Sequence, residues 1–134
     1  GMSLARRHAL SASTLCALAL LIGACRTAAV YNPTDIALVS PQPLSIEGVS
    51  AVIDRAARLQ GWQVENLQPG SKLASKSRGR AIATATIVYD TRAFSIQLRS
   101  SVGLRQSGDK IHKLYNKWVE ALETTILQES AAPQ

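Results

Sequence analysis

Residues 80–99 read Arg-Ala-Ile-Ala-Thr-Ala-Thr-Ile-Val-Tyr-Asp-Thr-Arg-Ala-Phe-Ser-Ile-Gln-Leu-Arg, and they predict a β-hairpin. Side chains of a strand alternate between its two faces. One face of the first strand then carries Ala81, Ala83, Ala85, Ile87 and Tyr89, and one face of the second carries Phe94, Ile96 and Leu98. A two-residue turn at Thr91-Arg92 would pair Tyr89 with Phe94 and bring these apolar faces together.

An amphipathic helix is expected on each side of this hairpin. In residues 45–61, Ser45 is a good N-cap and Gly61 supplies a left-handed C-terminal residue. Its apolar stripe is Val49, Val52, Ile53, Ala56 and Leu59. The second helix should begin at a cap on Ser107 or Asp109 and fade near Gln128. Its stripe is Ile111, Leu114, Tyr115, Trp118, Val119, Leu122 and Ile126.

Two weaker strands, residues 62–65 and 72–77, should precede the hairpin, with a turn at Pro69-Gly70 between them. Lys72 and Lys76 suggest that the second is an edge strand protected by charge. The predicted fold is α+β: helix, four-stranded antiparallel meander, helix, with both helices on one face of the sheet. Residues 36–39 form either an extra N-terminal strand or a segment that packs over the core.

The first 25 residues predict export. Arg6 and Arg7 precede an uncharged, mostly apolar run, residues 9–24, that ends in small residues before Cys25. This pattern is typical of a secretory signal peptide, here residues 1–24. The run is shorter than the roughly 20 apolar residues of a membrane-spanning helix. Gly1, ahead of Met2, looks like a residue left over from cloning.

Ile22-Gly23-Ala24-Cys25 resembles the lipobox of bacterial lipoproteins, in which the cysteine is acylated and becomes the new N-terminus. The resemblance implies a membrane anchor of fatty acyl chains, such as palmitate, on Cys25. Arg26 follows, where an aspartate would retain such a protein in the inner membrane; by that sorting rule we expect the outer membrane, facing the periplasm. We expect a tether over residues 25–34, one α+β domain over 35–128 and a flexible tail over 129–134.

A second resemblance extends over most of the chain after Cys25. It rests on Gly61-Trp62-Gln63-Val64, Pro69-Gly70, Ile87-Val88-Tyr89-Asp90 and the run Ile-His-Lys-Leu-Tyr-Asn-Lys-Trp-Val at residues 111–119. These motifs are similar to those of a group of small, uncharacterised proteobacterial lipoproteins. The resemblance implies a lipoprotein with this fold; because the group has no established activity, it implies none.

Candidate catalytic groups are few. His112 is the one histidine after the signal, at a polar helix edge with Asn116 one turn on. A general base needs a partner and a pocket, which the sequence does not indicate, so a hydrogen-bonding histidine at the core boundary is the preferred interpretation. With one histidine and no cysteine after Cys25, we expect no metal, no cofactor and no catalytic residue.

The charge is unevenly placed. The chain carries +6; without Arg6 and Arg7, 13 basic residues face nine acidic ones, a net +4. Residues 72–105 hold seven basic side chains, and Asp90 is their one acid. We expect a polar, cationic binding surface on the sheet face away from the helices: Arg80, Thr84, Thr86, Gln97 and Arg99. The alternative is that this face is simply exposed to solvent, with its charged residues contributing to solubility and not to binding.

An anionic envelope component or another envelope protein would suit this surface. Nucleic acid is not expected, because RNA-binding sheets expose aromatic residues, whereas Tyr89 and Phe94 fall on the opposite face. The favoured interpretation is a membrane-anchored periplasmic lipoprotein of the cell envelope that acts as a non-enzymatic binding or assembly module. One alternative is a carrier of a small apolar ligand or lipid, which requires an apolar cavity. Another is a hydrolase that uses His112.

Overall fold

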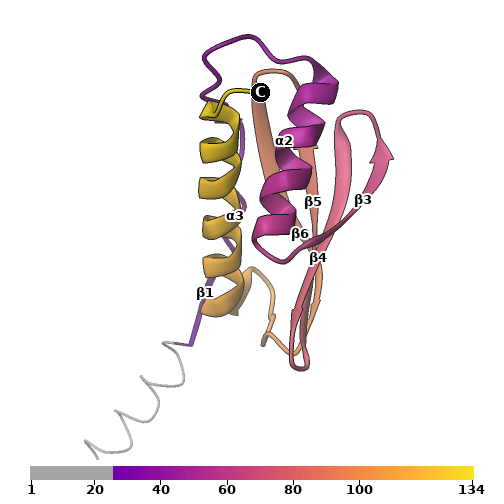
Figure 1. Ribbon diagram of the computed structural model, residues 1–134. Helices are drawn as coiled ribbons and strands as arrows, with labels where there is room; N and C mark the ends of the chain where they lie inside the picture. Colours follow the sequence, from indigo (N-terminus) through magenta and orange to yellow (C-terminus); the bar gives the residue numbers. More distant parts are fainter. Residues whose placement is uncertain (1–25) are drawn as a thin grey trace, which may run out of the picture.

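The computed structural model describes residues 26–134, so the signal peptide and Cys25 lie outside the described residues. The predicted α+β class is confirmed. Within residues 26–134, two helices accompany a five-stranded antiparallel sheet and a separate two-stranded pair (Figure 1). The elements are β1 Thr27–Ala29, β2 Ile36–Ala37, α2 Ile46–Leu59, β3 Gln63–Gln68, β4 Ser71–Arg78, β5 Ala81–Tyr89, β6 Ala93–Val102, β7 Lys110–His112 and α3 Lys113–Ala131.

The strand order in the large sheet is β2-β6-β5-β4-β3, and every neighbouring pair is antiparallel. The first two residues of the 36–39 segment therefore form an extra strand, β2, along β6. The predicted hairpin register is confirmed, since Tyr89 lies opposite Phe94 and Ile87 opposite Ile96. Further along, Thr84 pairs with Ser100 and Ala85 with Leu98, so Arg99 is the extra residue of a β-bulge.

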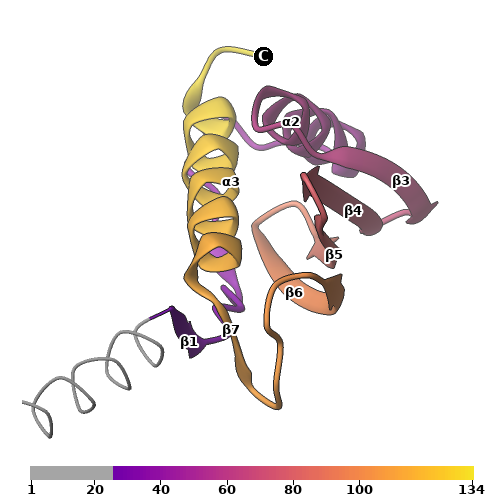
Figure 2. The same cartoon turned by 90° about the horizontal axis from the view of Figure 1, so that it is seen from below.

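Both helices lie on the same side of the large sheet (Figure 2). Ala74, Ala83 and Ala85 are fully buried on the covered face, where their small side chains let the helices approach closely. Trp62, just after α2, meets Trp118 of α3 edge-to-face, with ring centroids 6.5 Å apart. The rest of the core comes from Val49, Val52, Ile53, Ala56, Ala57, Ile87, Tyr89, Phe94, Ile96, Leu104, Ile111, Tyr115, Val119, Leu122 and Ile126.

The two helices differ in how well their ends were predicted. Ser45 caps α2 by accepting the N–H of Gly48 at 3.0 Å, as expected, although Leu59 in the last turn is 66% exposed. The α3 start was predicted wrongly: its N-cap is His112, not Ser107 or Asp109. Residues 110–112 pair as β7 with β1, and a strand-paired backbone cannot also be helical.

The prediction for strand β4 was also wrong. It lies between β3 and β5, so it is an inner strand, and β3 is the edge. Lys72 alternates along β4 with the buried Ala74 and is itself fully buried, and Lys76 faces the ring of Trp118 on α3. These two lysines face the helices and do not protect an edge.

Residues 27–34, expected to belong to a tether, instead lie against the domain. β1 pairs with β7. The side chain of Asn116 on α3 accepts the N–H of Tyr31 and donates to the carbonyl of Ala29, both at 2.9 Å. Asn32 Oδ1 accepts the N–H of Leu98 at 2.9 Å, and the carbonyl of Pro33 accepts that of Ile96 at 2.9 Å. The first of the described residues are therefore already part of the folded domain.

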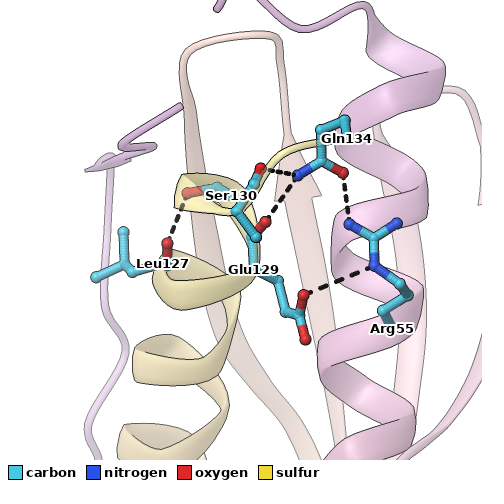
Figure 3. A network of polar contacts seen from close by, with 6 residues as sticks. Arg55, Leu127, Glu129, Ser130 and Gln134 are labelled. Carbon is cyan, nitrogen blue, oxygen red and sulfur yellow. Dashed lines mark hydrogen bonds and ion pairs between the residues drawn. The ribbon is translucent and has the colours of Figure 1, made fainter. Parts of the chain in front are cut away.

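Residues 129–134, expected to be a flexible tail, also make contacts (Figure 3). Helix α3 continues to Ala131, and the buried Ser130 donates to the carbonyl of Leu127. The side-chain oxygen of Gln134 accepts from Arg55 of α2 at 2.5 Å, and Arg55 also lies 3.7 Å from the carboxylate of Glu129. The C-terminal residues thus join α3 to α2.

The contact between the N-terminal segment and α3 should be detectable as a raised pKa of Tyr31. The Tyr31 hydroxyl donates to Oε1 of Glu123 on α3, and this hydrogen bond, with burial and the negative charges of Glu123 and Glu120, raises the pKa of Tyr31 to about 12. Because this pKa exceeds the unfolded value of about 10, the stabilisation is fully present below pH 10 and is lost as the pH rises through 12.

We expect Glu123→Gln to bring the pKa of Tyr31 down towards 10, read from tyrosinate absorbance against pH. Tyr31→Phe identifies the transition that belongs to Tyr31, while Tyr89 and Tyr115 are common to all three proteins. An unchanged absorbance curve in Glu123→Gln would place Tyr31 away from α3.

Candidate functional site

The residues of the predicted cationic surface do not share one place. Thr84, Thr86 and Gln97 lie on the face of the sheet that the helices leave uncovered, and Thr86 is directly opposite Gln97. Arg80 lies in the turn between β4 and β5, and Arg99 is the bulged residue of β6; both are exposed. The arginines therefore flank the polar centre of the uncovered face at its β4–β5 turn and along β6.

The uncovered face also carries apolar side chains, which alternate with the buried residues of β5. Ile82 and Val102 lie directly opposite each other at the end of the sheet nearest the β4–β5 turn, 44% and 63% exposed. Val88 is exposed near the other end of β5. The face is thus polar in the middle and apolar towards both ends.

On the covered side, the ammonium group of Lys72 is fully buried between β4 and α2. Its Nζ atom lies 2.7 Å from the hydroxyl of Ser50, 2.6 Å from Oδ1 of Asn66 and 2.9 Å from Oδ1 of Asp54. The same Nζ lies 5.6 Å from the ring centre of Tyr89. An ammonium has three protons, so three acceptors satisfy it completely. We call Ser50, Asp54, Asn66, Lys72 and Tyr89 the lysine cluster.

Members of the lysine cluster line two pockets, and Asn66 lines both. The larger, about 340 Å³, lies between the start of α2 and the β3–β4 turn. It is lined by Ile46, Glu47, Ser50, Asn66, Leu67, Gln68, Pro69 and Tyr89. The other, about 270 Å³, is lined by Asp54, Arg58, Trp62, Val64 and Asn66. The larger pocket combines a carboxylate and amides with the ring of Tyr89, which suits a small ligand with polar and apolar parts.

Lys76 is the second cation on the covered face. Its Nζ donates to the carbonyl of Gln60 at 2.6 Å and lies 5.4 Å from the ring centre of Trp118. Burial lowers the pKa of Lys76, and the positive charge of Arg78 lowers it further. Lys76 therefore caps the C-terminal end of α2 and packs against Trp118 of α3. Both contacts indicate a structural role.

The predicted polar helix edge, His112 and Asn116, lies against the N-terminal segment. Nδ1 of His112 accepts the N–H of Leu114 at 3.0 Å and so caps α3, while the side chain of Asn116 binds the backbone of Ala29 and Tyr31. Within residues 26–134 no group of three His, Cys, Asp or Glu side chains could hold a metal ion. In the same part of the chain, neither helix has the length and apolar character needed to cross a membrane.

Sequence reasoning missed the lysine cluster, although its parts were visible. Ser50 and Asp54 are four residues apart, which places them on one face of α2. Lys72 alternates with Ala74, so it had to face the same side as the apolar residues of β4. The predicted meander already places β3 beside β4; what the sequence does not reveal is that α2 brings Ser50 and Asp54 to the ammonium group of Lys72.

Comparison of the chain with protein-family models, curated proteins and solved structures finds no match.

The lysine cluster predicts a specific pattern of stabilities. Asp54→Ala leaves the buried ammonium of Lys72 with two neutral partners, and we expect it to lower the free energy of unfolding by roughly 2–3 kcal/mol. Lys72→Met keeps the length of the side chain and removes the charge, so its cost should be smaller. Urea denaturation at neutral pH measures both.

The control is the surface pair Arg55–Glu129, at 3.7 Å and partly exposed on both sides. Glu129→Ala should cost about 0–1 kcal/mol, because exposed ion pairs contribute little. If Asp54→Ala costs no more than Glu129→Ala, Lys72 is not held as a buried charge.

Proposed function

We propose that this protein is a lipoprotein of the bacterial cell envelope, anchored through acylated Cys25 in the outer membrane and facing the periplasm. Its folded domain serves as a non-enzymatic binding or assembly module. The sequence support is the signal-like segment, residues 1–24, and the lipobox-like Ile22-Gly23-Ala24-Cys25. Arg26, in place of an aspartate, favours the outer membrane.

The structural observation behind the proposal is the position of the first strand. β1 begins at Thr27, and the carbonyl of Arg26 accepts the N–H of Lys113 at 2.9 Å. Two residues of extended chain span about 7 Å. An acyl group on Cys25 would therefore hold the domain at the membrane surface, without the spacer we expected from the sequence.

The binding-module part of the proposal uses the uncovered face of the sheet. Thr84, Thr86 and Gln97 offer hydrogen-bonding groups at its centre, Arg99 adds a positive charge, and Val88 adds exposed apolar area. Another envelope protein with an acidic rim would complement these groups. His112 is already used as the cap of α3 and Asn116 holds β1, and this favours a binding role over a hydrolase.

The carrier of a small ligand is the second candidate, and the pocket beside Tyr89 favours it. The volume of about 340 Å³ is at the small end of the range for ligand sites. Glu47 and Gln68 on its wall suit a ligand with a polar head more than a wholly apolar one.

Acylation is tested on the full chain, exported by a bacterial host and purified from its membranes. We expect an N-terminus at Cys25, with a mass increase equal to a diacylglycerol group and one further acyl chain. Cys25→Ala should accumulate as the unprocessed precursor. A mature chain with an unmodified Cys25, or one cleaved elsewhere, would contradict the anchor.

The binding surface is tested by placing a photocrosslinking amino acid at Gln97, on the uncovered face, or at Lys117, exposed on α3. In whole cells we expect a discrete protein adduct from position 97 that Arg99→Glu weakens at least several-fold. Position 117 is the control and should give none. Equal adducts from both positions would show that the uncovered face is not a preferred surface.

A further inference from the structure

We propose that the end of the domain next to Cys25 binds anionic lipid headgroups directly. This surface, the basic end, consists of Arg26, Arg78, Arg80, Arg105, Lys110 and Lys113, all exposed, with the apolar pair Ile82 and Val102 at its margin. The inference deepens the proposed function, because it gives the anchored domain a fixed orientation. Its test does not depend on acylation.

Backbone contacts bring three distant segments together at this end. Lys113 N–H donates to the carbonyl of Arg26 at 2.9 Å, and His112 N–H donates to that of Leu104 at 2.8 Å. A Cβ on Gly103 would lie 2.8 Å from the carbonyl oxygen of Arg80, so only a glycine allows the β4–β5 turn and the loop after β6 to approach this closely. Figure 1 shows the start of β1, this turn and this loop at the same end of the molecule.

Little negative charge opposes the basic end. Among residues 26, 78–80 and 103–113, Asp109 is the one acid. The ion pairs described within residues 26–134 are Arg55–Glu129 and Lys72–Asp54, and neither involves the basic end. Its six cations therefore keep their charge available for an external partner.

The opposite end of the molecule has no comparable excess of positive charge. The start of α2, the β5–β6 turn and the end of α3 lie there in Figure 1, and they carry Glu47, Asp90 and Glu129. Arg92, in the same turn as Asp90, is a basic residue at that end, and Arg55 of α2 pairs with Glu129. The basic end is therefore the more positive of the two ends, and Cys25 directly precedes its Arg26 in the sequence.

A membrane is the partner that fits both the charge and the position. The predicted acyl site, Cys25, directly precedes Arg26 of the basic end, so a lipid anchor and this surface would meet the same bilayer. Each Lys or Arg close to an anionic membrane surface strengthens binding by about fivefold at moderate salt. Ile82 and Val102 can enter the boundary between headgroups and acyl chains, as exposed apolar residues of interfacial proteins do.

The test uses a chain that starts at residue 26 and carries no lipid. Circular dichroism checks that this chain and each of its variants are folded. The protein is sedimented with phosphatidylcholine vesicles that either contain or lack phosphatidylglycerol. We expect binding only to the vesicles with phosphatidylglycerol, weakening at least tenfold as the salt concentration rises towards 1 M.

Two variants of equal net charge locate the surface. Arg78→Glu with Arg80→Glu should reduce binding at least tenfold. The control, Arg58→Glu with Arg92→Glu, changes exposed arginines outside the basic end and should change binding by less than threefold. Ile82→Ser with Val102→Ser should weaken binding several-fold without changing its dependence on salt.

Equal losses in the two charge variants would mean that net charge alone drives binding, and this would overturn the proposal. So would an absence of binding to anionic vesicles by the folded protein. Neither result bears on the acylation of Cys25. Conversely, an unmodified Cys25 would contradict the anchor but not the binding of lipid by the basic end.

Discussion

The whole arrangement depends on one constraint: the large sheet has a single face that must be removed from water. Ala83, Ala85 and Ile87 of β5 lie at its centre, and α2 and α3 both lie on that side. Helices on the same side must also pack against each other, as Trp62 and Trp118 do. The other face is left to solvent or to a partner, which is why the candidate binding residues Thr84, Thr86 and Gln97 lie there.

A buried charge is part of the same packing. Lys72 occupies a position on β4 that faces α2, and it is tolerated because Ser50, Asp54 and Asn66 accept all three of its protons. This geometry restricts how α2 can sit on the sheet, since a shift of the helix would take Ser50 and Asp54 away from the ammonium group. Members of the lysine cluster also line two surface pockets, so a ligand in either pocket would contact residues that hold α2 in place.

The N-terminal segment links the fold to the proposed anchor. β1 is held by β7 and by Asn116, and its first residue, Thr27, is two residues after Cys25 in the sequence. In the proposed arrangement, a lipid at Cys25 and a positive surface around Arg26 would act on the same bilayer, and each would limit the motion that the other allows. A domain held in this way would present its uncovered sheet face at a defined angle to the membrane, which would suit a module that binds or assembles a neighbouring protein.

Local patterns in the sequence determined much of this protein. The stripes of α2 and α3, the Ser45 cap and the register of the β5–β6 hairpin follow from periodicity and turn chemistry, which act over a few residues. Tertiary structure alone decided the burial of Lys72 and the bulge at Arg99. It also decided the β1–β7 pairing, because of which α3 starts later than predicted, and it placed Arg26, Arg80 and Arg105 at the same end of the domain. Each of these depends on contacts between residues far apart in the chain, such as Tyr31 with Asn116, and their free energy is set by packing that no local pattern encodes.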